Sequence, residues 1–233
     1  MNFATLKGLT IPEGVVAQIT DASGRVLWVV PSGNKPAILQ VKKIVSNTYG
    51  TTTYTNEEFI LLSITVKAGG TVNVTYGGLT KTLNNLLTSD SAYSVWFGTY
   101  NGSSDSVATP ASGELRIEGD YKAIALGSYN MAKSQTRKCH CIVFIDFGSA
   151  ELVPSQAFFY DDGNMSEVLT SAIITSSVKE IGDKPFYRCA NLSSVTFENT
   201  SGWYDETGAA LDVSDPAHNA ELLRNGAGNW YRS

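Results

Sequence analysis

The segment 178–197 carries apolar residues at a spacing that neither a helix nor a simple strand explains. An amphipathic helix repeats apolar residues about every third or fourth position, and a half-buried strand repeats them at alternate positions. Here the end of the segment reads Leu192-x-x-Val195-x-Phe197, which is a short strand preceded by a turn. A unit of this kind cannot bury its apolar face alone, so we expect it to stack on a neighbour. The apolar residues are Val178, Ile181, Phe186, Cys189, Leu192, Val195 and Phe197.

A degenerate copy of this unit precedes it by 28 residues. Val153 stands 28 positions before Ile181, and Phe158 stands 28 positions before Phe186. Self-similarity at such a period is typical of stacked repeats, which need covering at both ends. We expect the preceding domain to cover one end and the C-terminal tail to cover the other. Each unit also has an apolar pair after a polar gap, expected at Val168-Leu169 and at Val195-x-Phe197.

The C-terminal tail carries a helix start signal. Asp215 is placed to cap the helix and Pro216 to occupy its first position, where a missing N–H costs nothing. We expect a short helix that runs to about Arg224 and is stopped by Gly226. Four aromatic residues are expected to close the open face of the last repeat, namely Trp203, Tyr204, Trp230 and Tyr231.

The pattern from Ser177 to Val195, with Ile181-Gly182-Asp183, Phe186-Tyr187 and Cys189 at its centre, resembles the BspA-type leucine-rich repeat. That family occurs in surface proteins of gut bacteria and protists and in phages of gut bacteria. The resemblance implies a short leucine-rich-repeat domain over residues 147–233 that ends in a small helical cap. The earlier unit departs from the pattern, because Asp161 stands near the place of the cysteine and an insertion follows over 161–164.

Residues 37–146 contain evenly spaced, strand-like runs without helical patterns between them. Gly-Gly pairs at 69–70 and 77–78 separate three of the runs, as in tight hairpins. This spacing predicts a central antiparallel β-sandwich. Residues 84–91 fit either a loop or a short helix. The expected strands are Ile38–Val45, Phe59–Lys67, Thr71–Tyr76, Leu79–Leu83, Ser94–Tyr100, Glu114–Glu118, Tyr121–Leu126 and Cys139–Phe144.

Residues 1–36 are expected to form a separate attachment module. Two β-rich runs, 15–19 and 25–30, flank a turn sequence that ends in Gly24, which predicts a hairpin. The stretch 31–36 begins and ends with proline and reads as a linker. The chain is therefore expected to be mostly β, with three domains at 1–36, 37–146 and 147–233.

Charge and composition exclude several functional classes. The net charge is −5 with no basic run, so nucleic-acid binding is not expected. No apolar run approaches the roughly 20 residues of a membrane span. The first ten residues hold one lysine and no apolar core, so we expect no secretory signal peptide. The three cysteines do not suggest a disulfide framework.

Three segments are similar to tail-module proteins of phages that infect gut Firmicutes. They are 9–16, 24–28 and 66–82, the last reading Val-Lys-Ala-Gly-Gly-Thr-Val-Asn-Val-Thr-Tyr-Gly-Gly-Leu-Thr-Lys-Thr. The resemblance implies a non-enzymatic virion structural protein, associated with the tail, that contacts other virion proteins and a bacterial surface glycan or protein. Many copies would add avidity, and a homo-oligomer is expected. The alternatives are a head decoration or scaffold protein, a bacterial cell-surface adhesin and a carbohydrate-active enzyme on the virion.

No residue is assigned a catalytic, cofactor-binding or metal-binding role. Cys139 and Cys141 would face one side of a strand and His140 the other, so the three are expected to be core or half-buried residues rather than to take part in metal or disulfide chemistry. His218 is expected on the surface of the C-terminal helix. The pairs Asp161-Asp162 and Asp205-Glu206 are expected to be solvated turn residues rather than the two carboxyls of a glycosidase. The stretch 161–164 lacks the spacing of a full calcium loop.

Aromatic residues in the central domain are the candidates for sugar stacking, although the specific binding residues stay unassigned. Aromatic faces are common at recognition surfaces, but the same residues can serve as core or cover strands. The candidates are Tyr49, Tyr54, Tyr93, Trp96 and Tyr100.

Overall fold

The computed structural model describes residues 18–20, 26–29, 34–42, 47–49, 52–54, 59–100, 103–104, 111–127, 141–159, 169–226 and 228–233. The chain forms two compact units, Met1–Asn34 and Lys35–Ser233. In the first unit, β1 (Gln18–Thr20) and β2 (Val26–Val29) pair antiparallel. Residues 31–33, half of the expected linker, lie outside the described part.

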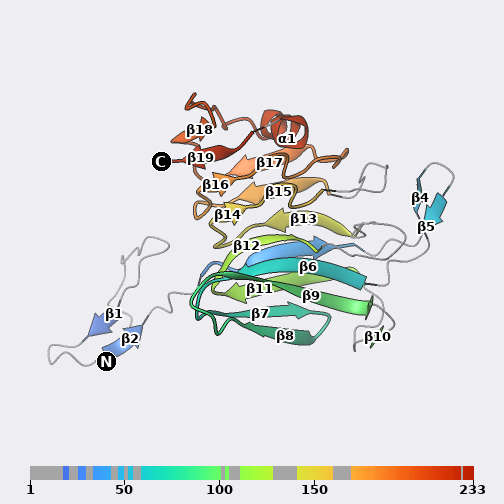
Figure 1. Cartoon of the computed structure of the whole chain (residues 1–233), viewed down its shortest axis with the longest axis vertical. Helices are drawn as coiled ribbons and strands as arrows, with labels where there is room; N and C mark the ends of the chain where they lie inside the picture. The colour runs from blue at the N-terminus through green and yellow to red at the C-terminus, as the bar shows by residue number, and fades with distance from the viewer. Residues whose placement is uncertain are drawn as a thin grey trace, which may run out of the picture. The chain divides into compact units, whose positions relative to one another are not determined.

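The second unit is built from two mixed β-sheets, whose strands stack as rungs along the long axis (Figure 1). A separate pair joins β4 (Asn47–Tyr49) to β5 (Thr52–Tyr54). The eight-stranded sheet has the order β10 (Ser103–Ser104), β9 (Ser91–Tyr100), β6 (Phe59–Val66), β12 (Tyr121–Leu126), β14 (Leu152–Val153), β16 (Glu180–Ile181), β19 (Trp230–Arg232), β18 (Trp203–Asp205). The seven-stranded sheet has the order β17 (Ser194–Phe197), β15 (Ser171–Ile174), β13 (Ile142–Asp146), β3 (Ala37–Val41), β11 (Gly113–Gly119), β7 (Thr71–Tyr76), β8 (Leu79–Asn84).

The mostly-β class predicted from the sequence is confirmed, and several strand bounds match. β7 and β12 have the predicted limits, whereas the last strand of the central region begins at Ile142 instead of Cys139. Of the segment 84–91, which fits either a loop or a short helix, residues 85–90 form a loop, and its two end residues belong to β8 and β9. Among the described residues, no helix is both long and apolar enough to span a membrane.

The antiparallel pairing predicted for residues 37–146 holds among the described strands of that range, but both sheets extend beyond it. Strands up to β12 and β13 pair antiparallel, but β12 also pairs parallel with β14, and β13 pairs parallel with β15. The edges of the antiparallel part carry unpaired N–H and C=O groups, and these accept the next strands directly. Both sheets therefore run without a break through residues 146 and 147, where the sequence suggested a domain boundary.

The stacked units repeat the 28-residue spacing in one sheet and a shorter spacing in the other. Val153 is the strand partner of Ile181, 28 positions away. In the facing sheet Ala172 pairs with Val195, 23 positions away. The predicted equivalence of Val168-Leu169 with Val195-x-Phe197 is therefore wrong. Ala172 and Ile174 occupy that place instead. The connection from β14 to β15 is longer than that from β16 to β17, and it includes residues 160–168, which lie outside the described residues.

A third unit, which the sequence analysis assigned to the sandwich, precedes these two. β13 pairs parallel with β15 in register, with Ile145 opposite Ala172. In all three units, three apolar residues follow one another with first two and then one residue between them. All nine of these apolar residues are buried. The three sets are Ile142-x-x-Ile145-x-Phe147, Leu169-x-x-Ala172-x-Ile174 and Leu192-x-x-Val195-x-Phe197.

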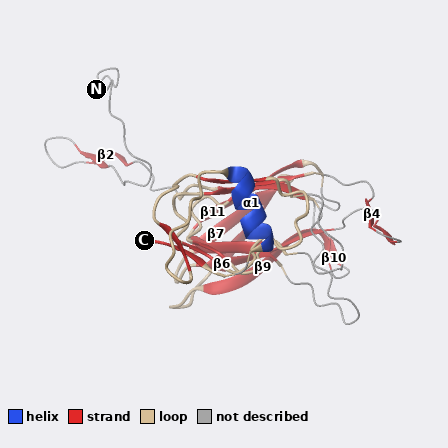
Figure 2. Ribbon diagram, turned by 90° about the horizontal axis from the view of Figure 1, so that it is seen from above, coloured by secondary structure: helices blue, strands red, loops and turns tan. Residues whose placement is uncertain are grey.

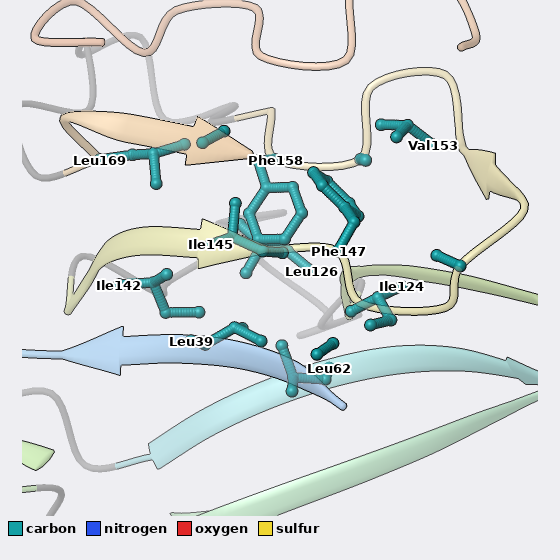
Figure 3. Close-up of a cluster of buried hydrophobic side chains, with 14 of the residues drawn as sticks. Leu39, Leu62, Ile124, Leu126, Ile142, Ile145, Phe147, Val153, Phe158 and Leu169 are labelled. Carbon is teal, nitrogen blue, oxygen red and sulfur yellow. The ribbon is translucent and has the colours of Figure 1, made fainter. Parts of the chain in front are cut away.

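One hydrophobic core runs between the sheets and joins the antiparallel part to the repeats (Figure 3). The ring of Phe147 contacts the ring of Phe158 edge to face at 5.9 Å, and Phe158 lies 6.1 Å from Phe186. The chain of aromatic contacts thus passes from one unit to the next. Side chains of both parts form a single cluster, including Leu39, Leu62 and Ile124 from below and Phe147, Val153, Phe158 and Leu169 from above.

The predicted C-terminal helix is confirmed as α1 (Pro216–Asn225), which lies over the end of the stack and packs on β17 (Figure 2). The Asp215 carboxylate accepts hydrogen bonds from the N–H groups of residues 217 and 218, and Gly226 ends the helix. The buried amide of Asn219 donates to the carbonyl oxygens of Val195 at 3.0 Å and Val213 at 2.9 Å. These bonds attach the helix to the last strand of the seven-stranded sheet.

We expect Asn219→Ala to lower the free energy of unfolding by about 2–3 kcal/mol. The substitution leaves two buried carbonyl oxygens without their donors, and each such loss costs about 1–3 kcal/mol. Urea denaturation followed by circular dichroism measures the change. Asn225→Ala, at the exposed end of the same helix, is the matched control and should shift stability by no more than about 0.5 kcal/mol. Equal effects of the two substitutions would contradict the attachment role.

The opposite end of the seven-stranded sheet is the edge strand β8, which carries a lysine on its inner face. Leu79, Lys81 and Leu83 are half-buried and alternate with exposed residues. The Lys81 ammonium donates to the carbonyl oxygen of Trp96 and lies 3.9 Å from the centre of its indole ring. An inward-pointing charge on an edge strand discourages a second chain from pairing with that edge.

Replacing Lys81 with leucine should therefore promote self-association through β8. The inner face of the strand becomes wholly apolar, and the edge strand loses the charge that opposes pairing. Light scattering coupled to size-exclusion chromatography should show a larger mass than for the wild type at the same concentration. Thr80→Val, on the exposed face of β8, is the control. An unchanged mass for Lys81→Leu would refute this role for the lysine.

Candidate binding surface

The cysteines are structural where the structure describes them. Cys141 and Cys189 are buried, while Cys139 and His140 lie outside the described residues. The Cys189 thiol donates to the carbonyl oxygen of Phe158 at 3.1 Å, which links two successive units. Burial raises the pKa of this thiol. In the described part of the chain, no three side chains of the His, Cys, Asp and Glu types lie close enough together to hold a metal ion.

Native protein at about pH 8 should leave Cys189 unmodified by iodoacetamide. The thiolate is the reactive form, and a buried thiol with a raised pKa stays protonated at that pH. Peptide mapping by mass spectrometry, with and without denaturant, reads the modification at each cysteine. Complete alkylation of Cys189 without denaturant would show that the thiol is accessible and reactive.

Of the remaining polar candidates from the sequence, Asp205 is the one whose described contacts serve the fold. His218 is exposed on α1. Asp205 accepts hydrogen bonds from the N–H groups of Thr207 and Ala209, each at 2.9 Å, and from the Thr207 hydroxyl, and these bonds lower the pKa of its carboxyl. Asp205 therefore shapes a turn that also includes Glu206. Asp161 and Asp162 lie outside the described residues, so the two acidic pairs are not brought together here.

Two of the predicted aromatic candidates are described with their side chains, and both are half-buried. The Tyr93 hydroxyl donates to the side-chain oxygen of the buried Asn85 at 3.2 Å. The Trp96 ring lies under the Lys81 ammonium at the end of the sandwich. These rings thus have partners within the protein. The side chains of Tyr49, Tyr54 and Tyr100 lie outside the described part.

The C-terminal aromatic residues divide between core and surface. Trp203 and Trp230 are buried and close the last unit against Phe197, which lies 5.1 Å and 6.2 Å from the two rings. Tyr204 and Tyr231 point the other way and are 38% and 42% exposed. The prediction that all four close the repeat is therefore correct only for the tryptophans. Alternation along each strand places the tyrosines, which are direct cross-strand partners, on the outer face.

A second aromatic surface lies on the turns that connect the strands of successive units. Phe159 and Tyr187 stand 28 positions apart, and their rings stack at 5.4 Å with planes inclined by 17°. Two cations surround the rings: the Lys184 ammonium lies 5.8 Å from the Tyr187 ring, and the Arg188 guanidinium lies 5.5 Å from Tyr187 and 5.9 Å from Phe159. We call Phe159, Lys184, Tyr187 and Arg188 the repeat-turn cluster.

The stacking of the turns explains why these side chains meet. The N–H of Gln156 donates to the carbonyl of Asp183, and the N–H of Phe158 donates to that of Pro185. Gln156 and Lys184 occupy the same place in successive units and share left-handed backbone angles, with φ of 52° and 46°. Because the two turns have the same conformation, the residues three positions later, Phe159 and Tyr187, are placed one above the other. At Gly182, any side chain would collide with the backbone of residue 155 in the turn below.

Four other basic residues of the second unit form ion pairs that the cations of the cluster do not form with the described residues. Lys35, Lys67, Arg116 and Lys122 each lie within 4.0 Å of a carboxylate. Among the described residues, neither Lys184 nor Arg188 forms such a pair. All four members of the cluster are half-buried, so they present a fixed, positively charged and aromatic surface.

The sequence analysis missed this cluster although its signal was present. Phe158-Phe159 and Phe186-Tyr187 are aromatic pairs at the repeat spacing. The first residue of each pair is core, as predicted, and the second is displayed outward on the turn. Searches of protein-family models, of curated proteins and of solved structures gave no match to this chain.

Proposed function

We propose that the chain is a non-enzymatic structural protein of a phage virion, associated with the tail, that contacts the surface of the host bacterium. The proposal is supported by the resemblance of segments 9–16, 24–28 and 66–82 to phage tail-module proteins and of the repeats to the BspA type. The observation that carries the contact role is the repeat-turn cluster, a cationic and aromatic surface held on stacked turns.

Such a surface suits reversible recognition. Stacked rings bring large contact area with few rotatable bonds, and they cost little conformational entropy when a ligand binds. Continuous sheets behind the turns hold the four side chains in one geometry. Each contact of this size is weak, but several copies of the protein on one particle would act together through avidity.

The first test is quantitative mass spectrometry of purified phage particles from the source host. We expect the protein in a low, fixed copy number, a multiple of about three or six, as symmetric tail assemblies require. A copy number comparable to that of the major capsid protein would favour head decoration. Absence from the particles, together with detection on the bacterial surface, would favour the cell-surface adhesin.

The contact role has its own test, which is competition for adsorption. Purified full-length protein, added to host cells before phage, should slow adsorption in proportion to its concentration. Non-host bacteria incubated with the same protein are the control for nonspecific binding. Unchanged adsorption at saturating protein would overturn host contact while leaving a structural role in place.

A further inference from the structure

We infer that the repeat-turn cluster is a binding site for an anionic glycan, a surface polysaccharide that carries carboxylate or phosphate groups. This inference rests on the proposed function and specifies its ligand. It is argued from the charge, burial and stacking of Phe159, Lys184, Tyr187 and Arg188.

The charge of the cluster is opposite to that of the chain. The whole protein has a net charge of −5, yet Lys184 and Arg188 both lie beside the Tyr187 ring, half-buried and without a carboxylate partner among the described residues. The carboxylate of Asp183, next to Lys184 in sequence, already accepts a hydrogen bond from the N–H of Gly228 at 2.9 Å. Two neighbouring cations repel each other, so an anion that approaches both is favoured.

The chemistry of both cations suits oxyanions. The arginine guanidinium presents a planar fork of donors that matches the two oxygens of a carboxylate or phosphate, and lysine adds a compact point charge. Contact with the aromatic rings holds both cations in place before a ligand arrives. A third basic side chain, Arg224 of α1, is anchored beside this turn because its guanidinium donates to the carbonyl oxygen of Ala190 at 2.8 Å.

The stacked rings extend this preference to a sugar polymer. Because Phe159 and Tyr187 stack on each other, their exposed parts include ring edges, which carry partial positive charge and favour oxygen atoms. The apolar surface of aromatic rings also suits the C–H faces of sugars. Nucleic acid fits less well, because its affinity depends on many clustered lysines and arginines, and the chain has no basic run.

The test compares variants that remove charge without disturbing the backbone. Lys184 and Arg188 have left-handed backbone angles, with φ of 46° and 63°, and asparagine tolerates this region well. Lys184→Asn and Arg188→Asn therefore delete the cations with little cost to the turn. Gln156→Asn is the matched control, because residue 156 has the same place and the same backbone conformation one unit earlier but carries no charge.

Binding of the full-length protein is measured by biolayer interferometry to three immobilised polymers: polygalacturonate, a wall teichoic acid and neutral dextran. We expect the wild type to bind at least one of the two anionic polymers and not dextran. Lys184→Asn and Arg188→Asn should each weaken that binding at least about tenfold, since each removes a charge-assisted contact. Gln156→Asn should bind as the wild type does, and thermal melts verify that all variants are folded.

The polymer that binds identifies whether carboxylate or phosphate is the recognised group. Binding of dextran as strong as that of the anionic polymers would overturn the inference, as would wild-type affinity in both charge-deleted variants. The result is separate from that of the particle analysis. A protein present in virions that ignores both anionic polymers retains the proposed function without this site, whereas anionic-glycan binding by a protein absent from virions retains the site alone.

Discussion

The structure depends on backbone hydrogen bonding across the junction between antiparallel and parallel strands. β12 and β13 each have one antiparallel neighbour and one parallel neighbour. Every strand beyond them, up to β16 and β17, is added in parallel at the same two edges. The repeats therefore do not need a cap of their own at this end, because the sandwich supplies ready-made edges and apolar side chains such as Leu39 and Leu62.

Local patterns predicted the elements better than they predicted how the sheets join. The helix start at Asp215-Pro216 and the buried positions of segment 178–197 follow from capping chemistry and burial, which are local. The third unit, at Ile142, was missed because its strand reads like any buried strand. Only its partner, β15, distinguishes a repeat rung from a sandwich strand. Spacings of 28 and 23 residues in the two sheets further hid the equivalence of Ala172 and Val195.

The candidate surface was harder to predict than the fold. Buried residues are recognisable by their period, but an outward-facing Phe159 or Tyr187 looks in sequence like a second core residue beside the first. The pairing of rings across 28 residues, and the placement of Lys184 and Arg188 beside those rings, come from the stacked turns. Two residues that the sequence analysis considered for metal binding or catalysis have structural roles instead: Cys141 is buried in the core, and Asp205 accepts backbone hydrogen bonds within a turn.

The two ends of the seven-stranded sheet are closed by different means, a helix over β17 and an inward lysine on β8. Neither the helix nor the lysine takes part in the parallel pairing between units, although β17 itself pairs in parallel with β15. The number of units can therefore change without a change in the helix or in β8. Inserting one more copy of the repeat would move the C-terminal helix outward by one strand spacing, roughly 4.8 Å, and would add one more turn to the exposed face. Reach and contact area would grow together, in fixed steps, without a change at either end.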